Sequence, residues 1–286
     1  MGYFANFKKS FKFKYCANYL IITVFLVLAV VLRDAGLLSR SAVGLFTRIS
    51  YSIILAVSLN LIVGFLGELS LGHAGFMCVG AYIGCLCANL LHAYISSNLL
   101  VLILAMLIGG VMAGIFGFLI GIPVLRLRGD YLAIVTLAFG EIIKNILNSC
   151  YLGVDGSGMH FSLKDAASLK LAADGKVIIN GAIGITGLHK ASTFTAGILL
   201  ILVTLFVILN LINSRAGRAI MSIRDNRIAA EATGINVTKY KLMAFITSAV
   251  FAGMGGVLYA LNFSTLAAKK FDYNTSILVL VFVVLG

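Results

Sequence analysis

Charged residues are scarce in this chain of 286 residues. They make up 11% of the sequence, whereas hydrophobic residues make up 61% and the mean hydropathy is +1.07. A soluble domain of this length does not need so much apolar surface, so the composition excludes that class. A single proline stands against thirty glycines, and glycine allows helices to pack closely in lipid. The sequence therefore predicts an all-α fold, a polytopic bundle of transmembrane helices.

Sequence motifs for catalysis and cofactor binding are also missing. The five cysteines contain no C-x-x-C pair, and neither they nor the four histidines have the spacing of metal ligands. The cysteines are Cys16, Cys78, Cys85, Cys87 and Cys150. No Gly-x-x-x-x-Gly-Lys-Ser/Thr loop is present to cradle a nucleotide. We expect no enzyme activity, no metal and no cofactor in this chain, and any ATP to be bound by another chain.

Eight apolar runs divide the sequence, and most approach the ~20 residues that a helix needs to cross a ~30 Å hydrocarbon layer. They are residues 16–32, 43–66, 73–91, 99–122, 131–147, 193–212, 242–262 and 276–286. The last run is too short to span a bilayer, so we expect the natural sequence to continue beyond residue 286. Together the runs predict a single transmembrane domain over residues 1–286.

Basic residues predict the orientation of the runs. The tail 1–15 carries four lysines and no small-residue cleavage site follows the first run, so we expect the tail to stay in the cytosol. Alternation then places the basic segments 123–130 and 213–241 on the same side. The net charge of +12 thus indicates membrane topology and not nucleic-acid binding. Residues 33–48, an outside loop with three arginines, are the exception to this pattern.

Residues 150–192 form the one clearly polar stretch on the predicted outer side. They are longer than a simple connector. We expect a short helix at 163–173 and a short strand at 176–180. The stretch fits two interpretations, a landing surface for an extracytoplasmic partner or a loosely ordered insert.

The cytosolic loop 213–241 carries helix signals of its own. Ser222 followed by Asp225 resembles a capping box, and Gly234 supplies a left-handed stop. The predicted helix between them combines the acid Glu231 with small side chains that another surface can approach closely. These small side chains are Ala229, Ala230 and Ala232. A docking element for a soluble partner and a solvated connecting helix both fit these residues.

Polar residues within or beside the apolar runs are candidates for a transport pathway, because the membrane makes them costly. The candidates are Asn60, Glu68, Ser70, His73 and Glu141. Glu68 and Ser70 lie in a glycine-punctuated break, residues 67–72, and His73 follows it directly. There the free N–H groups of the following helix can face an anionic group such as a carboxylate. The alternatives are a tight turn with an exposed glutamate, local neutralisation of Glu141 by Lys144, and an interhelical hydrogen bond from Asn60.

Small residues one turn apart predict faces where helices touch. They occur as Gly80 and Gly84, Gly110 and Gly114, Gly117 and Gly121, and Ala252 and Gly256.

Three blocks of sequence, residues 60–90, 128–148 and 217–260, resemble the permease subunits of bacterial ABC importers for branched-chain amino acids, specifically the LivM type. The matching stretches are LNLIVG at 59–64, LSLGHA at 69–74, RGDYLAIVTL at 128–137, GEII at 140–143, IRD at 223–225 and AAEATGIN at 229–236. The resemblance implies a permease that works by alternating access. The polar segment 150–190 looks longer than the family pattern.

The resemblance also implies a set of partners. These are a sister permease subunit, two cytosolic ATPases that use ATP and Mg²⁺, and an extracytoplasmic substrate-binding protein, all at the bacterial inner membrane. It implies that the helix at 222–234 is a coupling helix seated in an ATPase. The residues expected to carry the coupling are Ser222, Arg224, Asp225, Arg227, Ala229, Ala230, Glu231, Ala232 and Gly234.

Other functions fit parts of the sequence. A proton-coupled secondary transporter would use Glu68 and Glu141 as a relay, but no inverted repeat supports it. A membrane scaffold without transport activity would explain the glycine packing and the docking helix, but not the break. Within the importer class, a permease for urea or short amides is the alternative.

Overall fold

The computed structural model describes residues 40–92, 94–95, 97–127, 129–156, 158–171, 175–188 and 191–286, together with residues 23, 24, 27, 30 and 31. The basic tail 1–15 and most of the first apolar run, 16–32, lie outside the described residues. Within the described part the chain is mostly helical.

The described apolar runs fold as helices whose ends lie within a few residues of the predicted ones. The helices are α2 (Arg40–Asn60), which continues as the π-helix η1 (Leu61–Leu66), α3 (His73–Leu91), α4 (Asn98–Val124), α5 (Asp130–Asn148), α6 (Phe194–Asn213), α7 (Arg215–Asp225), α8 (Arg227–Ala232), α9 (Val237–Ala260) and α10 (Tyr273–Leu285). This order of helices is consistent with a polytopic membrane protein.

Five segments of the described chain are long and apolar enough to cross a membrane. They are Gly44–Leu66, His73–Leu91, Asn98–Val124, Phe194–Asn213 and Val237–Ala260. The predicted count of eight spans is therefore not confirmed. Of the remaining runs, α10 has 13 residues, fewer than a spanning helix needs, and α5 carries Glu141 and Lys144 in its second half.

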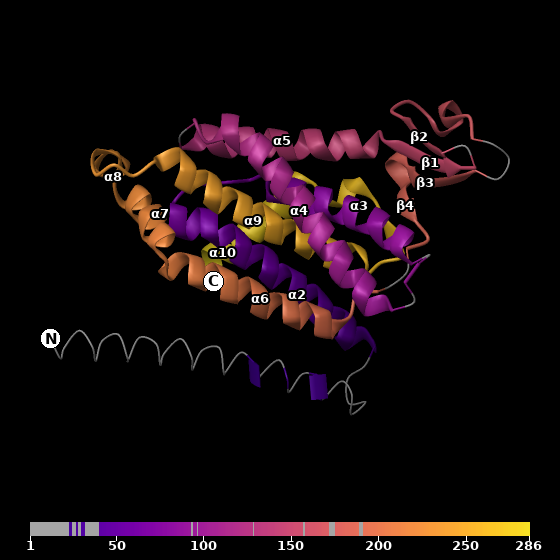
Figure 1. The fold of residues 1–286 in the computed structure, drawn as a ribbon, viewed down its shortest axis with the longest axis horizontal. Helices are drawn as coiled ribbons and strands as arrows, with labels where there is room; N and C mark the ends of the chain where they lie inside the picture. The colour runs from indigo at the N-terminus through magenta and orange to yellow at the C-terminus, as the bar shows by residue number, and fades with distance from the viewer. Residues whose placement is uncertain are drawn as a thin grey trace.

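Helix α9 lies at the centre of the bundle, packed against α2, α3 and α4 (Figure 1). Gly80 of α3 faces Gly253 of α9, and a Cβ at either position would collide with the other helix or with α4. At the same level, a Cβ on Gly109 of α4 would lie 2.7 Å from the carbonyl oxygen of Gly80. The three helices therefore touch through their backbones, which is how small residues bring helices together in lipid.

The glycines of the predicted contact faces all take part in this packing. Gly84 of α3 and the α4 glycines 110, 114, 117 and 121 each face side chains of α9, and Gly256 of α9 faces the backbone of Met77. The interpretation of these small residues as helix–helix contacts is confirmed.

A small β-sheet caps one end of the bundle (Figure 1), so the prediction of an all-α fold is wrong in this detail. Its strands are β1 (Tyr151–Asp155), β2 (Gly158–Ser162), β3 (Lys176–Asn180), β4 (Gly184–Thr186) and β5 (Thr265–Leu266). The order is β2-β1-β3-β4-β5 with antiparallel neighbours. Because β5 follows α9, the sheet joins two distant parts of the chain.

Two expectations for the polar segment have different outcomes. The strand at 176–180 is confirmed as β3. The helix at 163–173 is wrong for the described residues 163–171, where Ala166–Leu169 alone form a 3₁₀ turn, with Asp165 and Ser168 as its capping box. Serine and aspartate compete with the backbone for hydrogen bonds, and this favours a short capped turn over a longer helix.

Replacing Gly80 by alanine should lower the free energy of unfolding, because the new Cβ would meet backbone atoms of Gly253 that move only with the whole of α9. Overpacking of this kind costs about 1–3 kcal/mol. Gly44→Ala is the matched control, because nothing lies within 4 Å of a Cβ at that position in α2. Thermal unfolding of both purified variants in detergent is the measurement, and equal midpoints would contradict the packing.

Candidate functional site

The chain leaves the α-helical path where α2 continues into η1. The N–H of Gly67 donates to the carbonyl of Ile62, five residues back, and the N–H of Glu68 reaches the same oxygen at 3.1 Å. The side chain of Asn60 fills the space beside Gly64, where a Cβ would stand. Gly67 ends the turn with a φ of +74°. Short π-helical turns are rare and occur mostly at functional sites.

Residues 68–72 then run without regular structure into the bundle, so the predicted break between the two apolar runs is confirmed. The N–H of Leu71 donates to Thr136 Oγ1 on α5 at 3.0 Å. Gly72 packs against the backbone of Thr136 so closely that a side chain has no room. Ser70 is buried, and its Oγ has no hydrogen-bond partner among the described residues.

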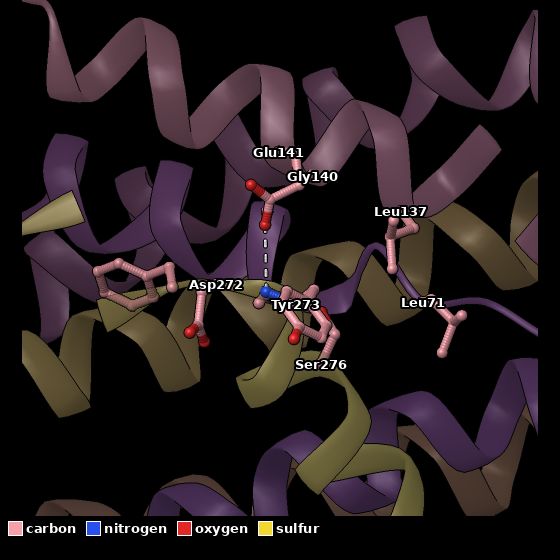
Figure 2. Close-up of a pocket in the computed structure, with 10 residues that line it drawn as sticks. Leu71, Leu137, Gly140, Glu141, Asp272, Tyr273 and Ser276 are labelled. Carbon is pink, nitrogen blue, oxygen red and sulfur yellow. Dashed lines mark hydrogen bonds between the residues drawn. The ribbon is translucent and has the colours of Figure 1, made fainter. Parts of the chain in front are cut away.

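The N-terminal ends of α3 and α10 meet beside α5 (Figure 2). Ser276 Oγ of α10 accepts the N–H of Ala74 at 3.1 Å, and Glu141 Oε1 of α5 accepts the N–H of Tyr273 at 3.1 Å. A cavity of about 10 Å³ lies between them, enough for about one water molecule. It is lined by Leu71, Ala74, Gly75, Leu137, Gly140, Glu141, Phe271, Asp272, Tyr273 and Ser276.

Charged side chains gather at and beside this cavity. Lys144 forms an ion pair with Glu141, one turn earlier on α5, so the predicted local neutralisation is confirmed. Asp272 Oδ1 caps α10 by accepting the N–H of Thr275 at 3.1 Å. Burial raises the pKa of Asp272, but hydrogen bonds from Thr275 and Asn274 outweigh it and bring the pKa below its usual value. Asp272 therefore stays ionised at neutral pH.

The structure places His73 between helices and not in the cavity. The residue is 1% exposed, and its Nε2 lies 2.9 Å from Ser58 Oγ of α2. Since that hydroxyl donates to the carbonyl of Leu55, the histidine donates from Nε2. Ser248 of α9 donates to the carbonyl of Ser58 at 2.6 Å. His73 thus joins the start of α3 to α2, which in turn bonds to α9.

Glu68, the other predicted acid, lies away from the cavity. It forms an ion pair with Lys241 of α9, and the two side chains are 14% and 4% exposed. The alternative of an ordinary exposed glutamate in a tight turn is therefore wrong. Of the five candidate pathway residues, Glu141 is the one that lines the cavity described above.

The loop after α6 forms two helices, so the prediction of one helix over 222–234 is wrong. α7 begins after Ser214, whose Oγ accepts the N–H of Gly217 at 3.2 Å. α8 begins after Asn226, whose Oδ1 accepts the N–H of Ala229 at 3.1 Å, and whose extended backbone separates the two helices. Asparagine is a strong N-cap, and here it interrupts the helical signal.

The predicted cap at Ser222 is also wrong. Ser222 lies inside α7, and its Oγ donates to the carbonyl of Ala219 at 2.8 Å. The predicted stop is confirmed, since Gly234 has a φ of +82°. The N–H of Ile235 returns to the carbonyl of Ala230 at 3.0 Å, as a left-handed helix end requires.

The exposed surface of α8 differs from the predicted small-residue face. Ala229 and Ala232 are exposed, but Ala230 is 3% exposed and packs into the chain. The most exposed apolar side chain of the helix is Ile228, at 80%. Sequence reasoning missed Ile228, although an isolated large apolar residue in a polar loop was an available signal. Arg227 bonds Glu231 one turn later at 2.9 Å and steadies this short helix.

Arg224 ties α7 to the π-helix. Its Nη1 donates to the carbonyl of Gly64 at 2.9 Å, and the same guanidinium contacts Asp225 at 3.2 Å. Of the predicted coupling residues, Arg224 therefore contacts the break directly, and Asp225 contacts Arg224.

Metal and thiol chemistry have little basis in the described part of the chain. No group of three His, Cys, Asp or Glu side chains there is placed to hold a metal ion. Burial raises the pKa of the Cys150 thiol, which lies just after α5, and a protonated thiol is a poor ligand and nucleophile.

Comparison with known proteins gives consistent matches. The family model described as "Branched-chain amino acid transport system / permease component" matches residues 41–286. The high-affinity branched-chain amino acid transport system permease protein LivM of Escherichia coli K12 is 36% identical over 92% of this chain and 63% of its own length. LivM of Salmonella typhimurium is 36% identical over 87% of this chain and 59% of its own length.

A more distant relative is the probable branched-chain amino acid transport permease protein LivM of Methanocaldococcus jannaschii. It is 24% identical over 76% of this chain and 66% of its own length. The chain thus spans about three fifths of the length of the two bacterial relatives. No solved structure matches it.

Glu141→Gln should destabilise the protein, because it leaves the Lys144 ammonium without its partner in a partly buried site. The expected cost is about 1–3 kcal/mol. The double variant Glu141→Gln/Lys144→Gln removes both charges and should recover most of this loss. Thermal unfolding compares the variants, and a double variant no more stable than the single one would show that the ion pair is not the cause.

Proposed function

Because this chain belongs to the family of branched-chain amino acid transport permease components, we propose that it is the membrane-spanning permease subunit of an ATP-driven importer. The importer moves branched-chain amino acids across the bacterial inner membrane. The chain itself is not an enzyme, and ATP with Mg²⁺ is hydrolysed by a separate ATPase.

The observation that carries the proposal is the exposed face of α8. Ile228 is a large apolar side chain that is 80% exposed on a helix capped by Asn226, and in this proposal a partner covers it. Ile228 projects from the same helix as the charged pair Arg227 and Glu231. An apolar anchor with a polar rim is the usual arrangement of a protein interface. The partner in this proposal is the cytosolic ATPase.

In this proposal, transport is driven by the change of the ATPase between its ATP-free and ATP-bound states. ATP binding closes the ATPase pair and moves α7 and α8, and the helix bundle then opens its pathway to the other side. The permease must contact the two ATPase states differently for this to work. The short helices α7 and α8, each fixed by a capping side chain, are rigid enough to carry that difference.

The cavity beside α5 is our candidate for part of the pathway. Glu141, Lys144 and Asp272 are charged and at least partly exposed there, and charged groups among apolar helices face water or another protein chain more readily than lipid. We therefore place this face of the chain toward the substrate pathway and the sister permease. The carboxylates suit the ammonium group of an amino acid, whereas the N–H groups of Ala74, Tyr273 and Thr275 are already bonded within the chain.

The remaining parts of the proposal concern partners and orientation. A sister permease completes the pathway, two ATPases bind on the cytosolic side with the N-terminus and α8, and a substrate-binding protein delivers the amino acid from outside. The five-stranded sheet is the structured surface at the opposite end of the bundle from α8 (Figure 1). It is our candidate landing site for the binding protein.

A proton-coupled secondary transporter is less well supported. A relay needs carboxyl groups spaced along one pathway, whereas Glu68 and Glu141 are each held in an ion pair with a lysine, and Glu68 does not line the cavity that Glu141 lines. The named relatives are branched-chain amino acid permeases, so urea and short amides have no support from them.

Ile228→Asp should break the contact with the ATPase, because it places a charge where an apolar anchor is needed. Losing one buried isoleucine costs about 1.5–3 kcal/mol, so affinity should fall about tenfold or more. Thr238→Asp, at an exposed position on the first turn of α9, is the matched control. Co-purification of the ATPase with each tagged permease in mild detergent is the measurement, and equal recovery with both variants would move the docking site elsewhere.

A substitution at position 228 tests docking of the ATPase more directly than one at position 230. Ala230 is buried in this chain, so Ala230→Trp would disturb the loop itself and not only a docked partner.

The energy source of transport distinguishes the proposed ATP-driven importer from a proton-coupled secondary transporter. The complete importer in lipid vesicles should take up leucine, isoleucine or valine when ATP is present, and should continue when a protonophore collapses the proton gradient. Excess urea should not compete. Uptake that needs the proton gradient and not ATP would replace the importer with the secondary transporter.

A further inference from the structure

Two basic side chains from different helices hold the break between α2 and α3. Arg224 of α7 donates to the carbonyl of Gly64 at 2.9 Å, and Lys241 of α9 forms the ion pair with Glu68. The two contacts are four residues apart on the broken segment. We call residues 214–236, between α6 and α9, the α7–α8 loop. Arg224 lies in this loop just before α8, and Lys241 lies on α9 just after it, so attachments to the segment flank α8 on both sides.

The Arg224 contact satisfies a carbonyl that the helix leaves free. Gly64 lies in the last turn of η1, where carbonyl groups have no partner further along the helix. The aliphatic stem of Arg224 also packs on Gly67, where a Cβ would lie 2.5 Å from its Cγ. The positive φ of Gly67 and the absence of its side chain are both needed for this fit.

The Lys241 contact is more deeply buried. The lysine side chain is 4% exposed and the glutamate 14%, and Glu68 Oε2 has no further partner among the described residues. Removing one member of such a pair leaves the other charge buried without compensation. The pair is therefore a strong attachment between α9 and the segment.

The far end of the segment lies at the candidate pathway. Three residues after Ser70, the segment enters α3, where the N–H of Ala74 donates to Ser276 Oγ beside the cavity. Leu71 is fixed to Thr136 of α5. Residues 64–68 are therefore separated from the cavity by only a few residues, which lack regular structure but are fixed to α5 at Leu71.

We propose that Lys241 and Arg224 are positioning residues that couple the α7–α8 loop to the candidate pathway, by holding residues 64–68 so that this segment and the start of α3 move with the loop. This inference rests on the proposed function and adds to it the route by which movement of the loop reaches the pathway. Neither residue touches substrate, and Lys241 is too buried to touch the ATPase.

The test uses the complete importer in lipid vesicles, with leucine as substrate. It measures the amount of leucine transported per ATP hydrolysed, together with recovery of the assembled complex. Glu68→Gln and Lys241→Gln each break the pair, Lys241→Arg keeps it, and Glu68→Lys/Lys241→Glu reverses it. Lys239→Gln is the matched control, because this exposed lysine lies two residues earlier on the same helix.

Glu68→Gln and Lys241→Gln should each lower the amount of leucine transported per ATP hydrolysed by about fivefold or more. A fivefold effect is the lower end of the range for coupling between two sites. The ATPase should stay bound and active in these variants. Lys241→Arg and Lys239→Gln should keep the wild-type ratio, and the reversed pair should recover much of it. A merely structural pair would reduce assembly and leave the ratio unchanged in the complexes that form.

Three results would overturn the inference. An unchanged ratio in both single variants would show that the pair carries no coupling. Loss of assembly with a normal ratio in the surviving complexes would make it structural. A wild-type complex that shows no ATP-driven leucine uptake would remove the proposed function and this inference together, and only that result would affect both.

Discussion

Lipid offers no hydrogen bonds, so each backbone N–H and C=O group within a membrane must find its partner inside the protein. This constraint decides how residues 61–72 can leave the helix. The carbonyl of Gly64 is satisfied by Arg224 and the N–H of Leu71 by Thr136. The break therefore depends on α5 and α7, two helices that come much later in the chain.

Backbone packing of α3, α4 and α9 supplies the rigid frame around this break. Helices that touch at glycine, as Gly80 and Gly253 do, leave little room for independent shifts, because interiors are close-packed. His73 and Ser58 add a polar connection from α3 to α2. The start of α3 is consequently held between a frame that resists movement and a segment fastened to the α7–α8 loop. In the proposed coupling, a displacement of that loop reaches the cavity beside α5 through this segment.

Local signals in the sequence predicted much of the helical architecture. Hydropathy placed α3 and α4 to within two residues, glycine spacing identified the contact faces, and Gly234 was identified as a helix stop from its residue type. The split at Asn226 was missed because Ser222 and Asp225 offered an equally plausible cap, and the choice depends on how the loop folds back on α9. The burial of Ala230 and the pairing of Glu68 with Lys241 were beyond reach for a related reason. They join residues that meet only in the tertiary structure.

The ion pairs with lysine change how Glu68 and Glu141, two acidic residues among apolar helices, are interpreted. A lone carboxylate in an apolar bundle indicates a proton or ion pathway. For this reason Glu68 and Glu141 were predicted from the sequence to be pathway residues. In the fold each faces a lysine, and Glu141 also accepts a backbone N–H from the start of α10. A charge used to hold a helix end or a broken segment must stay ionised, whereas a relay carboxyl must change its charge. The same residues cannot easily do both, so the lysine partners favour a transporter driven by its loop over one driven by protons.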